Sequence, residues 1–524
     1  MRIYRQLANV LAVAALVGCA ADPGPAPIAE DTKNSTSGTV EATPEVPADK
    51  KNRDEIVVGI DPLSNGLNPH LIADDTAFVQ SLANLVLPSA FQGETLNSDM
   101  LVSAEEVPAT AGAKQTIRYQ IREEAQWSDG APITGADFAY LWNNLKAEPA
   151  AIDSAGYRMI SNVRSENGGK VVYVDFQLPV ATWRQLFRHL LPSHLFSIGT
   201  ESFDKVLAST IPASGGKYMV RQVDRKRGVV ELGRNDRFWG KNPAQVELLT
   251  FREVNSVTQA VEMLRNQQLA YIDVVPTETT QDALALMGGV ETRTRTRAAT
   301  LRAQFNTQTV PDETVRRGLA SLIDVPVVAR LSAGRSAELD AYAAPKPDPE
   351  AVEAAKAHLN RPIRIAADPA DDQAIAAAQS TAALFRKAGF AAEVIATDFA
   401  DLSKKRLPEH GVDLSFVWAQ EPDSALAALS QFGCVDSALN HANGNLSQYC
   451  HAELEKQMQA WAQGGPAVEV AKLMQDRAVI VPIMRERRVE ALGTGIQGPA
   501  DKLAEWPKDP ISGAIDTAAG WRKK

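Results

Sequence analysis

Three cysteines are the residues whose types and spacing most directly suggest chemistry: Cys19, Cys434 and Cys450. The last two enclose fifteen residues rich in Asn, Ser and Gly. A disulfide between them would therefore close a loop and stabilise the fold by about 3 kcal/mol. The alternative is a metal site completed by His441 and His451, but the spacing C-x6-H-x8-C-H matches no common zinc pattern. The pattern predicts a Cys434–Cys450 disulfide in an oxidising compartment, with no metal and no cofactor.

Cys19 follows a segment that is typical of an export signal. Arg2 and Arg5 precede an apolar run over residues 7–17, which is too short to span a bilayer as a helix, since that takes about 20 residues. The run ends in Leu-Val-Gly-Cys, which resembles a bacterial lipobox, where the small residue permits cleavage and the cysteine thiol becomes a thioether to diacylglycerol. The alternative is a secretory signal with an incidental cysteine. We expect residues 1–19 to be a lipoprotein signal peptide.

Residues 20–53 contain Ala, Pro, Thr, Ser, Gly, Asp and Glu and almost no large apolar side chain. Such a segment cannot offset its ordering entropy, so we expect a disordered tether. Acyl chains on Cys19 would then hold the folded part at the extracytoplasmic face of the plasma membrane.

Several polar side chains follow short apolar segments in the second half of the chain. Residues 362–367, 392–396 and 413–418 are predicted strands, alternating with helices over 374–387 and 399–405. Gly389 is expected to end the first helix. Right-handed crossovers make such strands parallel, and ligands of parallel sheets lie beyond the carboxyl ends of the strands.

This arrangement places Asp368, Asp398 and the loop over residues 418–423 nearest a cleft. Carboxylates there, including Glu421 and Asp423, can accept hydrogen bonds from sugar hydroxyls or bind an amine, although exposed acids more often only solvate a surface. Trp418 can cover a sugar or an apolar chain with its ring face. These five residues are the ligand-binding candidates of this half.

Ser214, in the stretch Ala-Ser-Gly-Gly, is a further candidate, because the backbone of such a turn can approach a ligand or another lobe closely. The motifs G-x-S-x-G and H-E-x-x-H are absent, and the seven histidines are scattered. We therefore expect no catalytic residues and a protein that is not an enzyme.

The first half contains a clear run of elements. Residues 55–60 are a predicted strand, and residues 116–122 alternate apolar and polar side chains as a half-buried strand does. A turn at Trp127-Ser128-Asp129-Gly130 leads to Thr134, which is expected to cap a helix together with Asp137. A second alternating strand over residues 172–178 should bury Val172, Val174, Phe176 and Leu178 and expose Asp175.

The chain of 524 residues is too long for one hydrophobic core, so two or three domains are expected. Its formal net charge of −10 argues against a nucleic-acid partner, which needs clustered Lys and Arg.

Six segments in order resemble the family 5 extracellular solute-binding proteins, the oligopeptide, dipeptide and nickel receptors of ABC importers. The segments are IVVGIDPLSNGLNPHL at 56–71, IRYQIREEAQWSDGAPITGADFAYLW at 117–142, ASGGKYMV at 213–220, RNDRFWG at 234–240, LRNQQLAYID at 264–273, and FN with VRRGLA at 305–320. Within the family, the sequences of these segments are most similar to those of the LpqW-type lipoproteins of mycobacteria and corynebacteria.

The resemblance implies an α/β fold of the periplasmic-binding-protein-like type II class, with mixed sheets, two lobes around a hinge and an extra lobe (cluster C). It places lobe I at residues 54–95, 205–295 and 482–524, the extra lobe at 96–204, and lobe II at 296–481. The WSDG signature at 127–137 is expected to be structural rather than to contact a ligand.

The resemblance also implies a ligand and a partner. A receptor of this type holds a small molecule or a peptide between its lobes and docks on an ABC permease. An LpqW-type lipoprotein would instead bind a mannosylated glycolipid and act on a membrane glycosyltransferase in lipomannan and lipoarabinomannan assembly. The sequence departs from the peptide receptors where Trp418-Ala419 runs directly into Gln420, without the acidic residue that binds a peptide amine.

Overall fold

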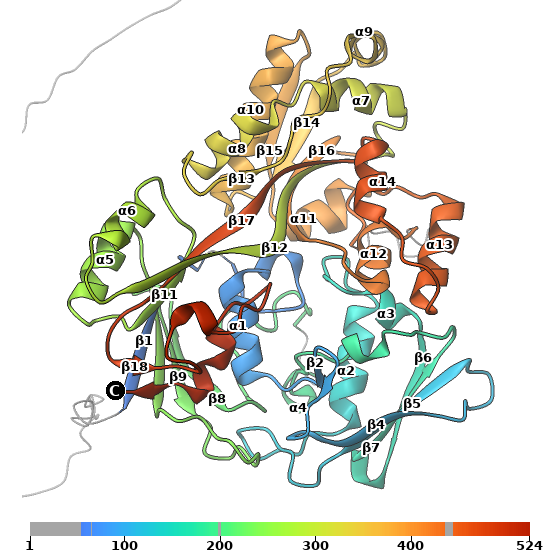
Figure 1. The fold of residues 1–524 in the computed structure, drawn as a ribbon. Coiled ribbons are helices and arrows are strands. Elements are labelled where there is room, and N and C mark those ends of the chain that lie inside the picture. The colour runs from blue at the N-terminus through green and yellow to red at the C-terminus, as the bar shows by residue number, and fades with distance from the viewer. Residues whose placement is uncertain (1–53, 64, 198–200, 435–443) are drawn as a thin grey trace, which may run out of the picture. The chain divides into compact units, whose positions relative to one another are not determined.

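A long mixed sheet runs through the described part of the chain and contains eleven strands, in the order β15-β14-β16-β12-β17-β11-β1-β10-β9-β8, with β13 on β17 (Figure 1). The computed structural model describes residues 54–63, 65–197, 201–434 and 444–524, which belong to one compact unit, Arg53–Lys524. The predicted signal peptide, Cys19, the tether and His441 lie outside the described residues.

The strands of the long sheet are β1 (Glu55–Ile60), β8 (Tyr218–Asp224), β9 (Val229–Arg234), β10 (Leu248–Glu253), β11 (Tyr271–Val274), β12 (Glu291–Phe305), β13 (Asp340–Ala341), β14 (Ile363–Ala367), β15 (Ala392–Ala396), β16 (Leu414–Gln420) and β17 (Ile480–Leu492). A second sheet has the order β4-β5-β7-β6, from β4 (Leu101–Val107), β5 (Gln115–Ile121), β6 (Ile160–Glu166) and β7 (Val171–Phe176). Two short pairs are β2 (Phe91–Gln92) with β3 (Thr95–Leu96), and β18 (Ile496–Gln497) with β19 (Arg522–Lys523).

The helices are α1 (Ala77–Val86), α2 (Gly135–Leu145), α3 (Ala155–Arg158), α4 (Ser193–Phe196), α5 (Val257–Arg265), α6 (Thr280–Ala285), α7 (Glu313–Ser321), α8 (Val325–Ala333), α9 (Pro349–His358), α10 (Asp372–Lys387), α11 (Phe399–Asp401), α12 (Ala425–Phe432), α13 (Ala452–Ala462) and α14 (Val470–Asp476). In the described ranges, no helix combines the length and the apolar character that crossing a membrane requires.

The first-half elements form where the sequence predicts them. Thr134 caps α2, and Asp137 returns the bond by accepting from the backbone N–H of Thr134, which completes a capping box. Leu178, however, is 37% exposed, and β7 ends at Phe176. Asp175 is buried instead, because its carboxylate accepts hydrogen bonds from Thr110 Oγ1 at 2.8 Å and Thr116 Oγ1 at 2.7 Å.

The second-half strands β14, β15 and β16 are parallel, as predicted. Gly389 follows α10 with φ +96°, a value that favours glycine at the end of a helix. The helix predicted over 399–405 consists of the short α11 followed by a π-helical turn, Leu402–Arg406. Residues 418–420 are not in a loop, because β16 continues to Gln420 by pairing with β12.

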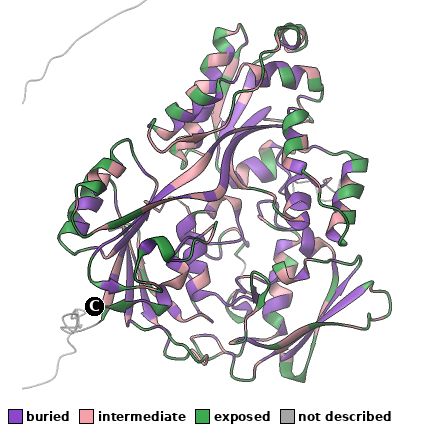
Figure 2. Ribbon diagram, viewed as in Figure 1, coloured by how far each residue is buried: buried purple, intermediate pink, exposed green. Residues whose placement is uncertain are grey.

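Strands β12 and β17 pair along most of their length and connect the part of the sheet that holds β1 with the part that holds β14 (Figure 1). Their register is interrupted between Thr296 and Thr300, where three residues of β12 lie opposite Glu486 of β17. A bulge of this kind bends a strand and increases its twist. The described strands on both sides are largely buried (Figure 2), with separate hydrophobic clusters around β1 and around β14.

Candidate functional site

A cavity of about 500 Å³ lies where strands of both parts of the long sheet reach their carboxyl ends. We call it the strand-end cavity. Its walls come from the segments after β1, after β14 and after β15, from the start of α1 and from β16. Its lining includes Asp61, Leu63, Asp74, Asp75, Phe78, Asp368, Asp371, Asp372, Phe399, Trp418, and, from β12 and β17, Arg297, Glu486 and Arg488. The cavity thus has the position that parallel α/β sheets favour for a ligand.

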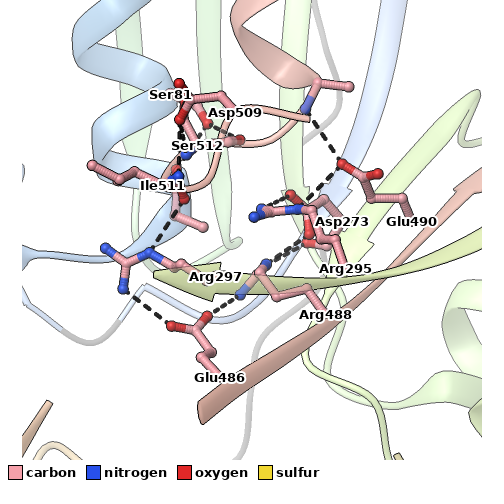
Figure 3. A network of polar contacts seen from close by, with 12 residues as sticks. Ser81, Asp273, Arg295, Arg297, Glu486, Arg488, Glu490, Asp509, Ile511 and Ser512 are labelled. Atoms are coloured by element: carbon pink, nitrogen blue, oxygen red, sulfur yellow. Dashed lines mark hydrogen bonds and ion pairs between the residues drawn. The ribbon is translucent and has the colours of Figure 1, made fainter. Parts of the chain in front are cut away.

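Two buried arginines hold the β12–β17 side of the cavity (Figure 3). Arg297 donates to Asp75 Oδ1 at 2.6 Å and to Glu486 Oε2 at 3.0 Å. Arg488 donates to Asp273 Oδ1 at 2.6 Å, to Glu486 Oε1 at 2.7 Å and to Asp61 Oδ2 at 2.7 Å. Glu486 therefore bridges the two arginines, and each arginine also reaches a carboxylate of another element.

The same pattern continues along both strands. Residues i and i+2 of a strand share a face, so Arg293, Arg295 and Arg297 of β12 line up on one side. Arg295 pairs with Asp273 at 2.7 Å and with Glu490 at 3.3 Å, and Arg293 pairs with Glu490 as well. We call these side chains, together with Arg297, Glu486 and Arg488, the charge ladder.

Opposed effects set the pKa values of the ladder carboxylates. Burial acts to raise the pKa of Asp273, but the charges of Arg488 and Arg295 outweigh it and lower that pKa. Burial is likewise outweighed at Glu486, whose pKa is lowered by Arg297 and Arg488. At Asp61 burial prevails over Arg488 and the pKa is raised. Asp273 and Glu486 are therefore ionised partners of the arginines.

The strand-end cavity has more carboxylates than cations. Arg297 and Arg488 are the basic residues of its described lining, and both are committed to carboxylates. Burial raises the pKa of Asp74 to about 6, although the N–H groups of Asn68 and Gly66 oppose it. Burial also raises the pKa of Asp371 to about 6. An anionic group entering the cavity would meet no unpaired cation among the described residues, whereas hydroxyl and amine donors would meet several acceptors.

The sequence-predicted candidates lie at different places. Trp418 and Asp368 line the strand-end cavity. Asp398 caps α11 by accepting from the N–H of Asp401, and it contributes to the raised pKa of Asp368, whose largest cause is burial. Phe399, the residue after Asp398, lines the cavity.

Glu421, Asp423 and Ser214 do not belong to the described lining of this cavity. Glu421 accepts a hydrogen bond from Tyr342 Oη at 3.1 Å and pairs with Arg485 at 3.4 Å, whereas Asp423 lies exposed in the segment between β16 and α12. Ser214 is buried, and its hydroxyl oxygen lies within hydrogen-bond distance of the backbone carbonyls of Val86 and Tyr218. Its turn approaches the end of α1 closely, because a Cβ at Gly216 would lie 2.3 Å from the Leu85 carbonyl oxygen.

The Cys434 and Cys450 sulfurs are joined in a disulfide, as the sequence predicts. Within the described ranges, no group of three or more His, Cys, Asp or Glu side chains is arranged to hold a metal ion.

Sequence reasoning missed the charge ladder, of which Arg297, Glu486 and Arg488 line the cavity. The signal is present in the sequence. Residues 291–297 read ETRTRTR, an alternation that places one kind of side chain on each face of a strand, and residues 485–490 read RERRVE. Since arginines on a buried strand face require carboxylate partners, this pattern predicts a buried ion-pair network.

Contacts also join elements on opposite sides of the cavity. Gln420 of β16 donates to Asp75 Oδ2 at 2.9 Å, next to the start of α1. Lys404, which follows α11, pairs with Asp204 at 3.1 Å and Glu148 at 3.4 Å, residues of the predicted extra lobe. The first contact joins β16 to the segment before α1, which both line the cavity, and the second joins the segment after α11 to the predicted extra lobe.

Asp371→Asn tests, through protein stability, whether the pKa of this carboxyl at the strand-end cavity is raised. Asp371 Oδ1 alone accepts the N–H groups of Gln373 and Ala374 at the start of α10, so an amide keeps both bonds. The folded-state pKa of Asp371, about 6, is higher than its unfolded value, so its stabilising effect is present at acid pH and lost as pH rises through 6. The variant is therefore expected to gain about 1–2 kcal/mol over the wild type between pH 4 and pH 7. Urea unfolding of both proteins across this pH range measures the difference in the free energy of unfolding. If that difference does not change with pH, the pKa of Asp371 is not raised.

Comparison with known proteins identifies the family. The family model described as bacterial extracellular solute-binding proteins, family 5 Middle, matches residues 103–437, more than half of the chain. The chain belongs to this family. The family and fold class expected from the sequence are thereby confirmed.

Curated family relatives are found in mycobacteria. The chain is 34% identical over 339 residues to the probable monoacyl phosphatidylinositol tetramannoside-binding protein LpqW of Mycobacterium tuberculosis, covering 62% of this chain and 51% of that protein. It is 25% identical over 276 residues to the oligopeptide-binding protein OppA of the same species, covering 50% of this chain and 46% of OppA. The chain thus spans about half the length of these curated relatives.

Solved structures of the same fold include the oligopeptide-binding protein AppA from Bacillus subtilis in complex with a nonapeptide, with a TM-score of 0.66 at 13% identity, covering 90% of this chain and 100% of AppA. The periplasmic EDTA-binding protein EppA has a TM-score of 0.66 at 22% identity, covering 90% of this chain and 97% of EppA. These likenesses establish the type II periplasmic-binding-protein fold.

Proposed function

We propose that this chain is an extracytoplasmic receptor that binds a solute in the strand-end cavity and acts without catalysis. The observation that carries the proposal is the position of the cavity, at the carboxyl ends of strands from both parts of the sheet that β12 and β17 connect. A ligand there touches both parts, so its contacts can favour a closed arrangement over an open one. Membership of the solute-binding family supports the same reading.

The chemistry of the lining restricts the ligand. Asp368 and Asp371 present carboxylate oxygens at the rim, and Trp418 adds an aromatic surface. Carboxylates and an indole suit a ligand that brings hydroxyl or amine donors together with an apolar face. A peptide with a free amine meets this description, and so does the sugar part of a glycolipid.

A second candidate function follows from the LpqW relative, whose printed name assigns it a phosphatidylinositol tetramannoside. In that version the mannose units would occupy the strand-end cavity and the lipid phosphate would stay outside, because the cavity offers an anion no unpaired cation among its described residues. The partner would be a membrane glycosyltransferase, whereas a peptide receptor would dock on an ABC permease.

Attachment to the membrane belongs to the same proposal. Lipid on Cys19 would keep the receptor at the outer face of the plasma membrane, near either partner. The Cys434–Cys450 disulfide supports an oxidising location.

A thermal-unfolding experiment with two probes tests the proposal. We expect either a pool of short peptides or a preparation of phosphatidylinositol mannosides to raise the melting temperature by a few degrees at saturating concentration, since a ligand that binds only the folded state stabilises it by mass action. A rise with peptides alone favours the permease-linked receptor, and a rise with the mannosides alone favours the glycolipid version.

Variants locate the binding. Trp418→Ala should abolish most of the rise, whereas Arg330→Gln, at an exposed cation on α8, should preserve it. If neither probe changes the melting temperature, or if Trp418→Ala responds like the wild type, the proposed binding in the strand-end cavity is wrong.

A further inference from the structure

A second cavity, of about 480 Å³, lies at the C-terminal end of α1 and shares no described lining residue with the strand-end cavity. We call it the Arg188 cavity. Its walls come from the end of α1 and the segment after it, from residues 215–217, and from the C-terminal segment. The lining includes Asn84, Phe91, Asp99, Arg188, Lys217, Trp239, Asp509 and Asp516.

Two cations of the Arg188 cavity have no counter-charge bound to them. Neither the Arg188 guanidinium nor the Lys217 ammonium makes a hydrogen bond or an ion pair with any residue that the structure describes. Arg188 is near enough to Asp153 and Asp516 to oppose the larger raising effect of burial on the pKa of each carboxyl, yet no ion pair joins it to either. This contrasts with the arginines of the strand-end cavity, whose donors are occupied.

The carboxylates of the Arg188 cavity are occupied differently. Asp509 Oδ1 accepts hydrogen bonds from the N–H groups of Ile511 and Ser512 and from Ser512 Oγ. Asp516 Oδ2 accepts from Asn84 Nδ2 and lies 2.5 Å from Ser512 Oγ, whereas Asp516 Oδ1 is buried without a partner. An unpaired buried polar atom is costly, and Asp516 Oδ1 is one. The half-buried Arg188 and Lys217 add two cations that a ligand could pair with.

The backbone that carries Arg188 has a costly conformation. Phe187 has φ 58° and His189 has φ 48°, so both neighbours of Arg188 are left-handed although neither is glycine. Among the described residues with positive φ, these are the only two non-glycine residues that flank a single position. Strained residues of this kind persist where the surrounding structure fixes them, and they concentrate at binding sites.

Hydrogen bonds from several elements fix this segment. Tyr157 Oη accepts from the N–H of Phe187 at 2.8 Å, and Ser89 Oγ accepts from the N–H of His189 at 2.9 Å. The Phe187 carbonyl accepts from the N–H of Ala90 at 3.0 Å, and the His189 carbonyl is 3.0 Å from His70 Nε2. Burial lowers the pKa of His70 to about 4, so its ring is neutral and donates through Nε2–H. The backbone at Arg188 is thus fixed by the protein before any ligand arrives.

We propose that the Arg188 cavity is a second binding site, for a small molecule that carries an oxyanion, either a carboxylate or a phosphate, which pairs with Arg188 and Lys217. The planar guanidinium matches both groups with two parallel hydrogen bonds, and the ammonium adds a point charge. A hydroxyl or amine of the same molecule can donate to Asp516 Oδ1. The preformed segment means that little ordering of the backbone accompanies binding.

Equilibrium dialysis tests the site with two probes, radiolabelled inorganic phosphate and radiolabelled citrate, in a chloride buffer of constant ionic strength. We expect retention of about one equivalent of at least one probe. Arg188→Gln should weaken retention about tenfold or more, because it removes charge-assisted hydrogen bonds, and Lys217→Gln should weaken it less. Phosphate alone identifies a phosphate ligand, and citrate alone identifies a carboxylate ligand. With a net charge of −10, the protein surface in general does not favour anions.

Controls separate this site from the strand-end cavity and from loss of folding. Trp418→Ala, in the other cavity, and Arg330→Gln, at an exposed cation on α8, should both retain the probe as the wild type does. Arg188→Lys keeps the charge and loses the planar fork, so intermediate retention is expected, and it serves as the test variant if Arg188→Gln does not fold. Two outcomes would overturn the proposal. One is that the wild type retains neither probe at a probe concentration of about 10 mM, which would detect even a very weak site. The other is that the wild type and the Arg188 variants retain a probe equally.

Discussion

Replacing Arg488 with Met will lower the free energy of unfolding by about 3–5 kcal/mol at neutral pH. Arg488 is buried and joins Asp61, Asp273 and Glu486 through bonds of 2.6–2.7 Å. Met fills a similar volume but removes the cation that, together with Arg295 and Arg297, lowers the pKa values of Asp273 and Glu486, and buried charge that is not compensated is costly. Urea unfolding of the wild type and the variant, followed by circular dichroism, measures the loss.

Acid should narrow the difference between Arg488→Met and the wild type. In the wild type the pKa values of Asp273 and Glu486 are lowered, so their stabilising effect is present above the unfolded pKa and is lost as pH falls through the folded pKa. The variant lacks this effect, and its deficit should therefore be larger at pH 7 than at about pH 2–3, where these carboxylates become protonated in the folded wild type.

Arg487→Met is the matched control on the same strand. Its side chain is 27% exposed, points to the other face, and pairs with Glu338 at 3.0 Å. Removing such a half-exposed pair should cost about 1 kcal/mol or less. Equal losses for the two variants would show that the charge ladder contributes nothing beyond an ordinary surface ion pair.

Removing the disulfide should have the second largest effect. Replacing Cys434 and Cys450 with Ala is expected to lower the free energy of unfolding by about 3 kcal/mol, because the open chain gains conformational entropy in the unfolded state. The bond spans a sequence separation of 16 and lies between α12 and α13. Unfolding without reductant compares the double variant with the wild type.

Reductant supplies the control for the disulfide prediction. It should destabilise the wild type toward the level of the double variant and leave the double variant unchanged. An unaffected wild type whose free thiols are then detected would contradict a stabilising role for this bond.

Local patterns in the sequence predict much of the fold. Alternation over residues 116–122, the Thr134–Asp137 cap and Gly389 each depend on neighbouring residues only, and each is found in the structure. Asp175 was misplaced, because its burial depends on Thr110 and Thr116, which are far away in the sequence. Periodicity describes which face a side chain is on, but it does not report a distant hydrogen-bond partner.

The sequence predicts where the candidate site lies better than it predicts which side chains line it. Strand-end logic places Trp418 and Asp368 at the cavity, and both line it. The same logic extended the loop to Glu421 and Asp423, whereas pairing with β12 prolongs β16 to Gln420 and brings Glu421 to Tyr342 and Arg485 instead. The arginines that line the strand-end cavity could not be predicted in the same way, and neither could the Arg188 cavity. Both depend on contacts between segments that are hundreds of residues apart in the sequence.

The interruption of register between Thr296 and Thr300 has a mechanical consequence. Ladder hydrogen bonds stiffen β12 and β17 on both sides of it, so we expect bending between the two parts of the sheet to concentrate where pairing is missing. Arg297 and Glu486 lie at this interruption and also line the strand-end cavity. A short solute that contacts only Arg297 and Glu486 would therefore favour the closed arrangement weakly, because these residues move little when the sheet bends. A solute long enough to contact both Trp418 and the start of α1 would favour closure more strongly, because these elements lie farther from the bend.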